Sequence, residues 1–177
     1  MFRQIEGLVP RDEFITAMRG VASSVTVVTT DGPAGRAGAT VSAFSSVSAD
    51  PPAVLVCLYA GSRIATFVKK NNVFCVNVLS ECSTDIADRF AGRHDEWISD
   101  RFSGIKSFGA PGTAPVIAGA TAFLCDVQQI MRSGSHLIFV GHVKKVLDGV
   151  AAPLTYREGV YHRVVPHGPQ GPVGAAG

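Results

Sequence analysis

The stretch GATVSAFSSVSADPP, residues 38–52, decides how the fold of this chain is interpreted. Small, β-branched and hydroxyl-bearing residues predict one strand over residues 37–48, which the two prolines at 51 and 52 end. Alternate residues of a strand point to opposite sides. One side is small and mostly apolar, and it carries Ala39, Val41, Ala43, Ser45 and Val47. The other carries four hydroxyls around one aromatic ring, at Thr40, Ser42, Phe44, Ser46 and Ser48.

The hydroxyl-rich side has two interpretations. It is either an ordinary solvent-facing side or a face against which a ligand lies. Hydroxyls and strand-edge amides can hydrogen-bond a planar heterocycle, and small side chains leave room for it. Polar groups set in an otherwise apolar pocket fix a ligand's orientation.

Strand patterns dominate the rest of the chain. Apolar and β-branched runs predict strands at 24–30, 53–59, 73–79, 120–131 and 136–148. The sequence RSGS predicts a hairpin turn between the last two, and LTYREGVYHRVV predicts a final hairpin around Glu158 and Gly159. Short helices are expected at 11–22, 62–72 and 83–92, with Ser62 as the cap of the second and Asn71 or Asn72 at its end.

This order of elements predicts the fold class. There are about seven strands and three short helices, and strands mostly follow strands, whereas a doubly wound α/β fold alternates strands with helices. A closed or partly closed antiparallel barrel with helices at its ends is therefore expected.

Composition limits the function. The 177 residues suit one domain, expected over residues 1–166, followed by a Gly/Pro-rich tail, 167–177, expected to be disordered. The net charge is only +2 with both signs interspersed, so no nucleic-acid partner is expected. The longest uncharged apolar run, AVLVCLYAG from Ala53, is about half of a membrane span. The first residues contain no apolar signal core, so a cytoplasmic protein without a membrane partner is expected.

Cysteine and histidine spacing argues against a metal site. The cysteines at 57, 75, 82 and 125 form no CxxC pair and are expected to be buried free thiols. His136 and His142 share one strand face but lie roughly 20 Å apart, too far to bind one ion. The glycine-rich GPAGRAG leads into a strand, so it is neither a dinucleotide fingerprint nor a P-loop.

Several segments together resemble the short-chain flavin reductase family. They are VVTTDG (27–32), TVSAFSSVSADPP (40–52), CVNVL (75–79), DIADRFAGR (85–93) and GSHLIFVGHV (134–143), within a match from about Phe14 to Val164. The resemblance implies a mainly β, FMN-binding split barrel, a Greek-key antiparallel barrel with short flanking helices. It also implies a homodimer that passes hydride from NADH or NADPH to FMN or FAD. Such proteins are reductase partners of two-component flavin monooxygenases.

The resemblance also implies the site residues. Flavin ring and ribityl contacts are expected from Thr40, Val41, Ser42, Ala43 and Phe44, with Ser46 and Val47 below them. Phosphate contacts are expected from Gly61, Ser62 and Arg63, with Phe67 and Val68 packing nearby and Arg93 as a second cation. His136 is the expected nicotinamide contact, although Ser135 precedes it where the family more often has an acidic residue. The last hairpin would close over the same cleft with Tyr156, Arg157, Gly159, Tyr161 and His162.

Three other functions remain open at this level. One is a reductase that keeps its flavin and reduces a metal complex, such as ferric iron or a cobalt corrinoid. The second is a non-catalytic flavin- or heme-binding module on the same barrel. The third is an enzyme similar to pyridoxamine-phosphate oxidase, although no cationic cluster for a second phosphorylated substrate stands out. The choices between FMN and FAD, and between NADH and NADPH, are open as well.

Overall fold

Three helices and twelve strands make up the described part of the chain, residues 7–149 and 152–168 of a computed structural model. The helices are α1 (Arg11–Arg19), α2 (Arg63–Asn71) and α3 (Thr84–Phe90). The strands are β1 (Ser23–Ser24), β2 (Thr26–Thr30), β3 (Ala37–Val41), β4 (Phe44–Ala49), β5 (Pro52–Tyr59), β6 (Val73–Val78), β7 (Ser107–Phe108), β8 (Val116–Ile117), β9 (Thr121–Ser133), β10 (His136–Leu147), β11 (Leu154–Arg157) and β12 (Val160–Arg163). Residues 169–177 of the expected tail lie outside the described residues.

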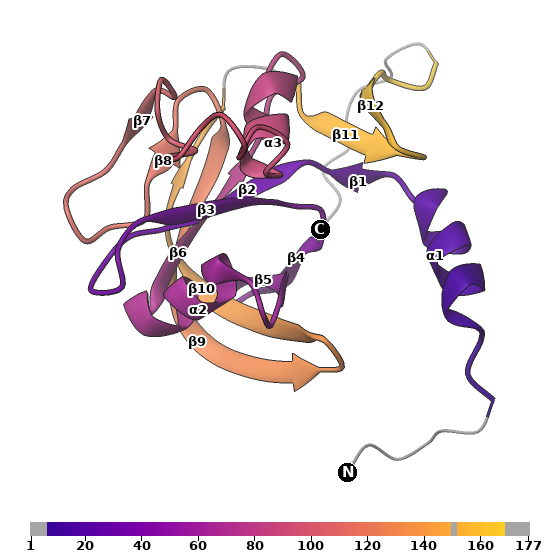
Figure 1. The fold of residues 1–177 in the computed structure, drawn as a ribbon, viewed down its shortest axis with the longest axis horizontal. Coiled ribbons are helices and arrows are strands. Elements are labelled where there is room, and N and C mark those ends of the chain that lie inside the picture. The colour runs from indigo at the N-terminus through magenta and orange to yellow at the C-terminus, as the bar shows by residue number, and fades with distance from the viewer. Residues whose placement is uncertain (1–6, 150–151, 169–177) are drawn as a thin grey trace.

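The seven-stranded antiparallel sheet curls on itself. Its order is β3-β2-β6-β9-β10-β5-β4, so β3 and β4 are its two edges (Figure 1). Only Ser42 and Ala43 separate these edges along the chain, so the edges must meet at that corner. The backbone N–H of Cys57 donates to the carbonyl of Ala43 at 3.0 Å, which holds the corner on β5. Because β3 and β4 are not hydrogen-bonded neighbours, the barrel is split along this line, and the predicted mainly β barrel is confirmed.

The prediction of one continuous strand over residues 37–48 is wrong. The chain breaks at Ser42 and Ala43 because it must pass from one sheet edge to the other, and β4 then shifts register between Ser46 and Ser48. The alternation of side chains between two faces is therefore not continuous along residues 37–48. Phe44 packs against the core, with its ring centroid 5.7 Å from that of Phe123, and the Thr40 hydroxyl donates to the carbonyl of Ala87. The expected continuous hydroxyl face does not exist.

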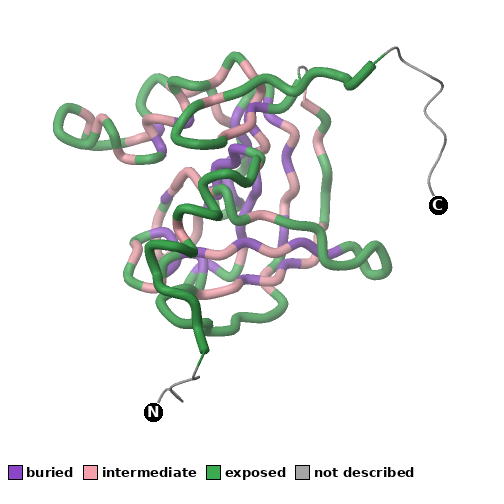
Figure 2. The backbone as a smooth tube through the Cα atoms, turned by 90° about the vertical axis from the view of Figure 1, so that its right-hand side faces the viewer, coloured by how far each residue is buried: buried purple, intermediate pink, exposed green. Residues whose placement is uncertain are grey.

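The core fills the barrel interior and the space beneath α2. Val28, Val56, Phe74 and Phe139 from four strands are fully buried together with Val68 of α2. Figure 2 shows buried segments in the middle of the molecule, whereas α1 is exposed except at Ile15, which is partly buried. A second cluster lies under α3 and includes Phe90 and Phe102, whose centroids are 4.9 Å apart.

The sequence signals for the ends of α2 and for the two late hairpins are confirmed, whereas α1 and α3 end at Arg19 and Phe90, before the expected residues 22 and 92. The Ser62 side chain caps α2 by accepting from the backbone N–H of Ala65 at 3.3 Å, and Asn72 ends the helix with a φ of 60°. β9 and β10 are joined through Gly134 and Ser135, and β11 and β12 around Glu158 and Gly159. The short strands β1, β7 and β8 were not predicted, because two residues carry no detectable period.

The cysteines are all free. Cys75 and Cys125 are buried, and burial raises the pKa of each thiol to about 12. Cys57 is only partly buried, and Cys82 is exposed between β6 and α3, so the prediction of buried thiols is wrong for these two residues. Over the described ranges, no helix is long and apolar enough to cross a membrane.

Candidate cofactor-binding site

A cavity lies between β3, the start of α2 and the segment that follows α3. Its volume is about 660 Å³, within the size range of ligand sites. Gly38 and Ala39 of β3 form one wall, and Ser62 and Arg63 form another. Residues 95 and 98–102 close the remaining side.

The start of α2 suits an anion. Its first turn holds no acidic residue, and free N–H groups with a partial positive charge point out of a helix start. The Arg63 guanidinium lies 4.9 Å from the centre of the Phe67 ring, and no described carboxylate lies within ion-pair distance of it. A Cβ atom at residue 61 would lie 2.8 Å from the Tyr59 ring, so glycine suits this position. The structure thus brings four predicted phosphate-site residues to one place: Gly61, Ser62, Arg63 and Phe67.

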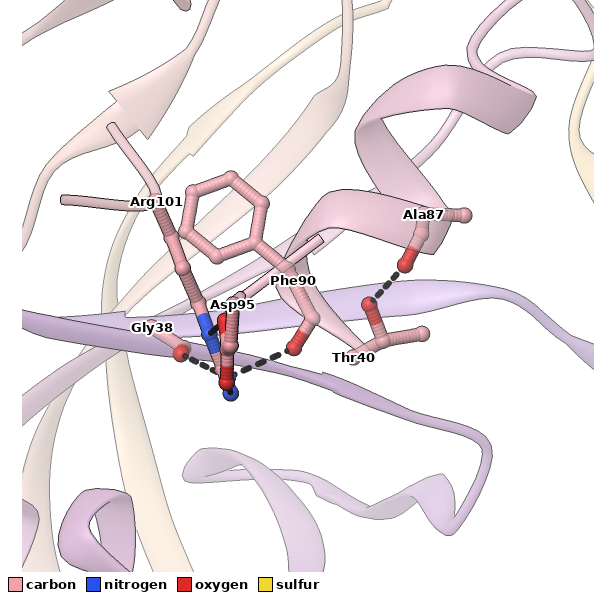
Figure 3. Close-up of polar contacts among 6 residues, drawn as sticks. All are labelled: Gly38, Thr40, Ala87, Phe90, Asp95 and Arg101. Carbon is pink, nitrogen blue, oxygen red and sulfur yellow. Dashed lines mark hydrogen bonds and ion pairs between the residues drawn. The ribbon is translucent and has the colours of Figure 1, made fainter. Parts of the chain in front are cut away.

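The facing wall contains a cation that sequence reasoning missed. Arg101 donates from Nε and Nη2 to the carboxylate of Asp95 at 2.9 and 2.5 Å, and from Nη1 to the carbonyls of Phe90 at 2.9 Å and Gly38 at 3.4 Å (Figure 3). The hydrogen bonds from Arg101 to the Asp95 carboxylate hold the pKa of Asp95 below its usual range.

Arg36 is a second missed cation in this cavity. It pairs with Asp100 at 2.8 Å and stacks over the Phe102 ring at 4.4 Å. The sequence features that could have indicated these two arginines are the cluster of charges in HDEWISDR, residues 94–101, and the arginine inside GPAGRAG. Both resemble ordinary surface charge until the fold brings them to one cavity.

Arg93 lies apart from this cavity. Its Nη1 is 3.1 Å from Asp88 Oδ1, the same atom that accepts from the Tyr161 hydroxyl at 2.6 Å. Burial, followed by the hydrogen bond to Asp88, raises the pKa of Tyr161 to about 12, so its hydroxyl remains protonated and donates. Arg93 and Tyr161 therefore join the last hairpin to α3, and Arg93 is not among the residues that line the cavity.

A second, smaller cavity of about 290 Å³ joins two predicted parts of the site. Ser42 of the barrel corner lines it together with Tyr156, Arg157 and Gly159 of the last hairpin. Side chains of α1, including Phe14 and Met18, cover it, a contribution that the sequence did not indicate.

His136 lines neither cavity. It lies at the start of β10, is exposed, and its Nδ1 is 3.0 Å from the Ser135 hydroxyl. Its ring meets that of Tyr59 edge-on, with centroids 6.0 Å apart, which places it near the turn that leads into α2. His162 is exposed, with Nε2 3.3 Å from the carbonyl of Arg157. Ser46 and Val47 are exposed on β4.

The chain belongs to the flavin reductase family. Residues 18–164 match the family described as the flavin reductase-like domain, so the resemblance seen in the sequence is confirmed. Within this class of oxidoreductases, FMN reductase (NADH) RutF of Variovorax paradoxus is 34% identical over 164 residues, which cover 90% of each chain.

Solved structures share the fold. NADH:FAD oxidoreductase SgcE6 of Streptomyces globisporus is 27% identical, with a TM-score of 0.80 over 97% of this chain and 98% of that one. Nitrilotriacetate monooxygenase component B from Mycobacterium thermoresistibile is 26% identical, with a TM-score of 0.79 over 94% of this chain and 96% of that one. The cofactor classes expected from the sequence, a flavin and a nicotinamide, are those that the names of these relatives give.

Proposed function

We propose that this protein is an NAD(P)H:flavin oxidoreductase that passes hydride from NADH or NADPH to FMN or FAD. The observation that carries the proposal is the cationic cavity between the start of α2 and β3, the strand that leads into the corner of the split barrel. The names of the relatives support NADH as donor, with FMN in one and FAD in another.

The residues suit a flavin that lies along the corner with its phosphate at α2. Ser62 and Arg63 would hold the phosphate, because Arg63 has no carboxylate partner among the described residues. The small Ser42 and Ala43 would leave space for the ring. The hairpin residues Tyr156 and Arg157, which share the smaller cavity with Ser42, would border the nicotinamide.

The chemistry needs little from the protein beyond positioning. A bound flavin supplies the hydride-accepting ring, so no side chain has to act as acid or nucleophile. The chain's residues bind the two cofactors, align them and exclude water from their contact. No single residue is therefore indispensable for turnover.

Purified protein tests the proposal through the absorbance of NADH at 340 nm under air. We expect NADH loss over many turnovers only when FMN or FAD is added, and the flavin with the higher kcat/KM names the preferred one. A yellow protein that binds flavin without oxidising NADH would contradict the proposal and favour a binding module. Turnover that depends on a ferric or cobalt complex, with flavin retained, would favour the bound-flavin reductase.

The partner and assembly are part of the proposal. Reduced flavin would pass to a monooxygenase, as the name of the nitrilotriacetate monooxygenase component suggests for that relative. We propose a homodimer in the cytoplasm, where free thiols such as the four here persist. Residues 1–166 would form the single catalytic domain, which agrees with the family match over residues 18–164.

A further inference from the structure

β3 is the strand of the cavity wall that has least support from the sheet. It is an edge strand and pairs only with β2. It also leads directly into the corner at Ser42 and Ala43, against which the flavin ring is proposed to lie. A movement of β3 at Gly38 would therefore change the wall of the larger cavity, whereas the corner itself is held on β5 by the hydrogen bond from the Cys57 N–H to the Ala43 carbonyl.

Two polar contacts join β3 to α3 and to the segment that follows α3. The Thr40 hydroxyl donates to the carbonyl of Ala87 in α3 at 2.7 Å, and Arg101 donates to the carbonyl of Gly38 (Figure 3). The strand lies directly on the Phe90 ring, since a Cβ at Gly38 would come within 2.5 Å of that ring. These contacts fix the distance between β3 and α3.

Arg101 joins three segments of the cavity wall at once. Its guanidinium contacts β3 through Gly38, the end of α3 through Phe90, and the following segment through both oxygens of Asp95. Such a set of contacts needs the planar five-donor fork of arginine, which lysine lacks. With these donors engaged, Arg101 is suited to hold the wall in place, whereas Arg63 opposite has no carboxylate partner in the described ranges.

We propose that Arg101 is a positioning residue that sets the affinity of the larger cavity for flavin by holding β3 and residues 95–102 against α3. This role rests on the proposed flavin reductase function, because flavin is the ligand whose affinity it would set. Arg101 acts through the wall that it fixes.

Steady-state kinetics of Arg101→Gln and Arg101→Lys test this role. We expect the KM for flavin to rise about tenfold in both variants, because a small displacement of a binding wall is costly. The kcat at saturating flavin and the KM for NADH should stay within about twofold of wild type, because the hairpin side of the cleft does not depend on Arg101. Lysine should fail to rescue, because it cannot form the paired contacts with Asp95.

Arg89→Gln is the matched control. Arg89 also fastens α3 to the segment after it, by donating to the carbonyl of Ser103, but it does not line the cavity. Its flavin KM should stay within about twofold of wild type. Asp95→Asn should raise the flavin KM in the same direction as Arg101→Gln, and the double variant should be no worse than Arg101→Gln alone.

Three results would overturn the proposal. They are an unchanged flavin KM in folded Arg101→Gln, full rescue by lysine, or an equal rise in Arg89→Gln. If Arg101→Gln does not fold, an unchanged flavin KM in Asp95→Asn would overturn it as well. If the wild-type protein reduces no flavin, the proposed function fails separately, and the quenching of flavin fluorescence on binding still compares the affinities of wild type and the variants.

Discussion

At the scale of single residues, the partners of each arginine separate its structural role from a binding role. Arg63 lines the larger cavity without a carboxylate partner among the described residues, while Arg93 pairs with Asp88 of α3 and Arg101 is bonded to one carboxylate and two backbone carbonyls. Arg36 is intermediate, since its pair with Asp100 is half-exposed and such pairs contribute only about 0–1 kcal/mol. An incoming anion can therefore compete for Arg36 more readily than for Arg101.

His136 is predicted to contact the nicotinamide. His136→Ala should raise the KM for NADH about tenfold, because one contact to the donor is lost, and leave the flavin Kd within about twofold of wild type. Steady-state kinetics and flavin fluorescence titration measure the two effects. His142→Ala on the same strand is the control and should change neither value. Loss of flavin binding with an unchanged NADH KM would refute the assignment.

Asp95 is predicted to make stability depend on pH. Its pKa is lower in the folded protein than in the unfolded chain, so its contribution is complete above about pH 4 and is lost as the pH falls through the folded pKa. The difference in urea midpoint between wild type and Asp95→Asn should be largest near neutral pH and close on acidification. In an Arg101→Gln background the same comparison should show no closing difference. A difference that grows at low pH would contradict this cause.

At the scale of elements, one buried amide connects three segments. Asn77 of β6 donates to the carbonyl of Val27 in β2 at 3.0 Å and to the Thr29 hydroxyl at 3.2 Å, and its Oδ1 accepts from the backbone N–H of Ile117 at 2.8 Å. These groups are buried, so removing the amide would take a hydrogen bond from each of them, and the backbone N–H of Ile117 would lose its acceptor. Asn77 thus positions β8, and the long segment before it, against the sheet.

Removing this amide should be costly. Asn77→Ala is expected to lower the free energy of unfolding by about 2–4 kcal/mol, because several buried polar groups each lose a hydrogen bond. Urea unfolding followed by circular dichroism measures the change. As a control, Gln128→Ala replaces an exposed side chain of β9, and its free energy of unfolding should stay within about 0.5 kcal/mol of wild type. A loss below about 1 kcal/mol for Asn77→Ala would show that the segment before β8 is held mainly by its apolar contacts.

At the scale of the whole molecule, apolar surface remains uncovered in a single chain. No residue of α1 is buried, and Phe14 and Met18 are about half-exposed there. Tyr59 and Met131 are exposed on the barrel. Exposed apolar surface is typical of an interface when it is contiguous, and the proposed homodimer would cover side chains of this kind.

The proposed dimer is tested by sedimentation velocity. We expect one species of twice the chain mass that persists on dilution to working enzyme concentrations, because burying apolar side chains at an interface stabilises the assembly. The measurement should be repeated with flavin to separate assembly from cofactor binding. A fully active monomer would contradict the proposed dimer and leave the reductase function intact.

Local pattern was sufficient for much of the fold. The three helices, the Ser62 cap, the Asn72 end and both late hairpins were predicted, because each depends on residues close together in sequence. The residues proposed to hold the phosphate could be grouped from the sequence for the same reason, since they are consecutive along one turn and helix start; their binding of phosphate stays a prediction.

By itself, the sequence determined a mainly β barrel, the ends of α2 and the family to which it belongs, because these follow from periodicity, turn residues and motif order. Only the tertiary structure decided where the strand over residues 37–48 breaks and which way Phe44 points, because a curled sheet must pass its chain across the corner. It alone brought Arg36 and Arg101 to the cavity and removed Arg93 from it. The physical reason is that the position of a charged side chain depends on long-range contacts, which leave no period in the sequence.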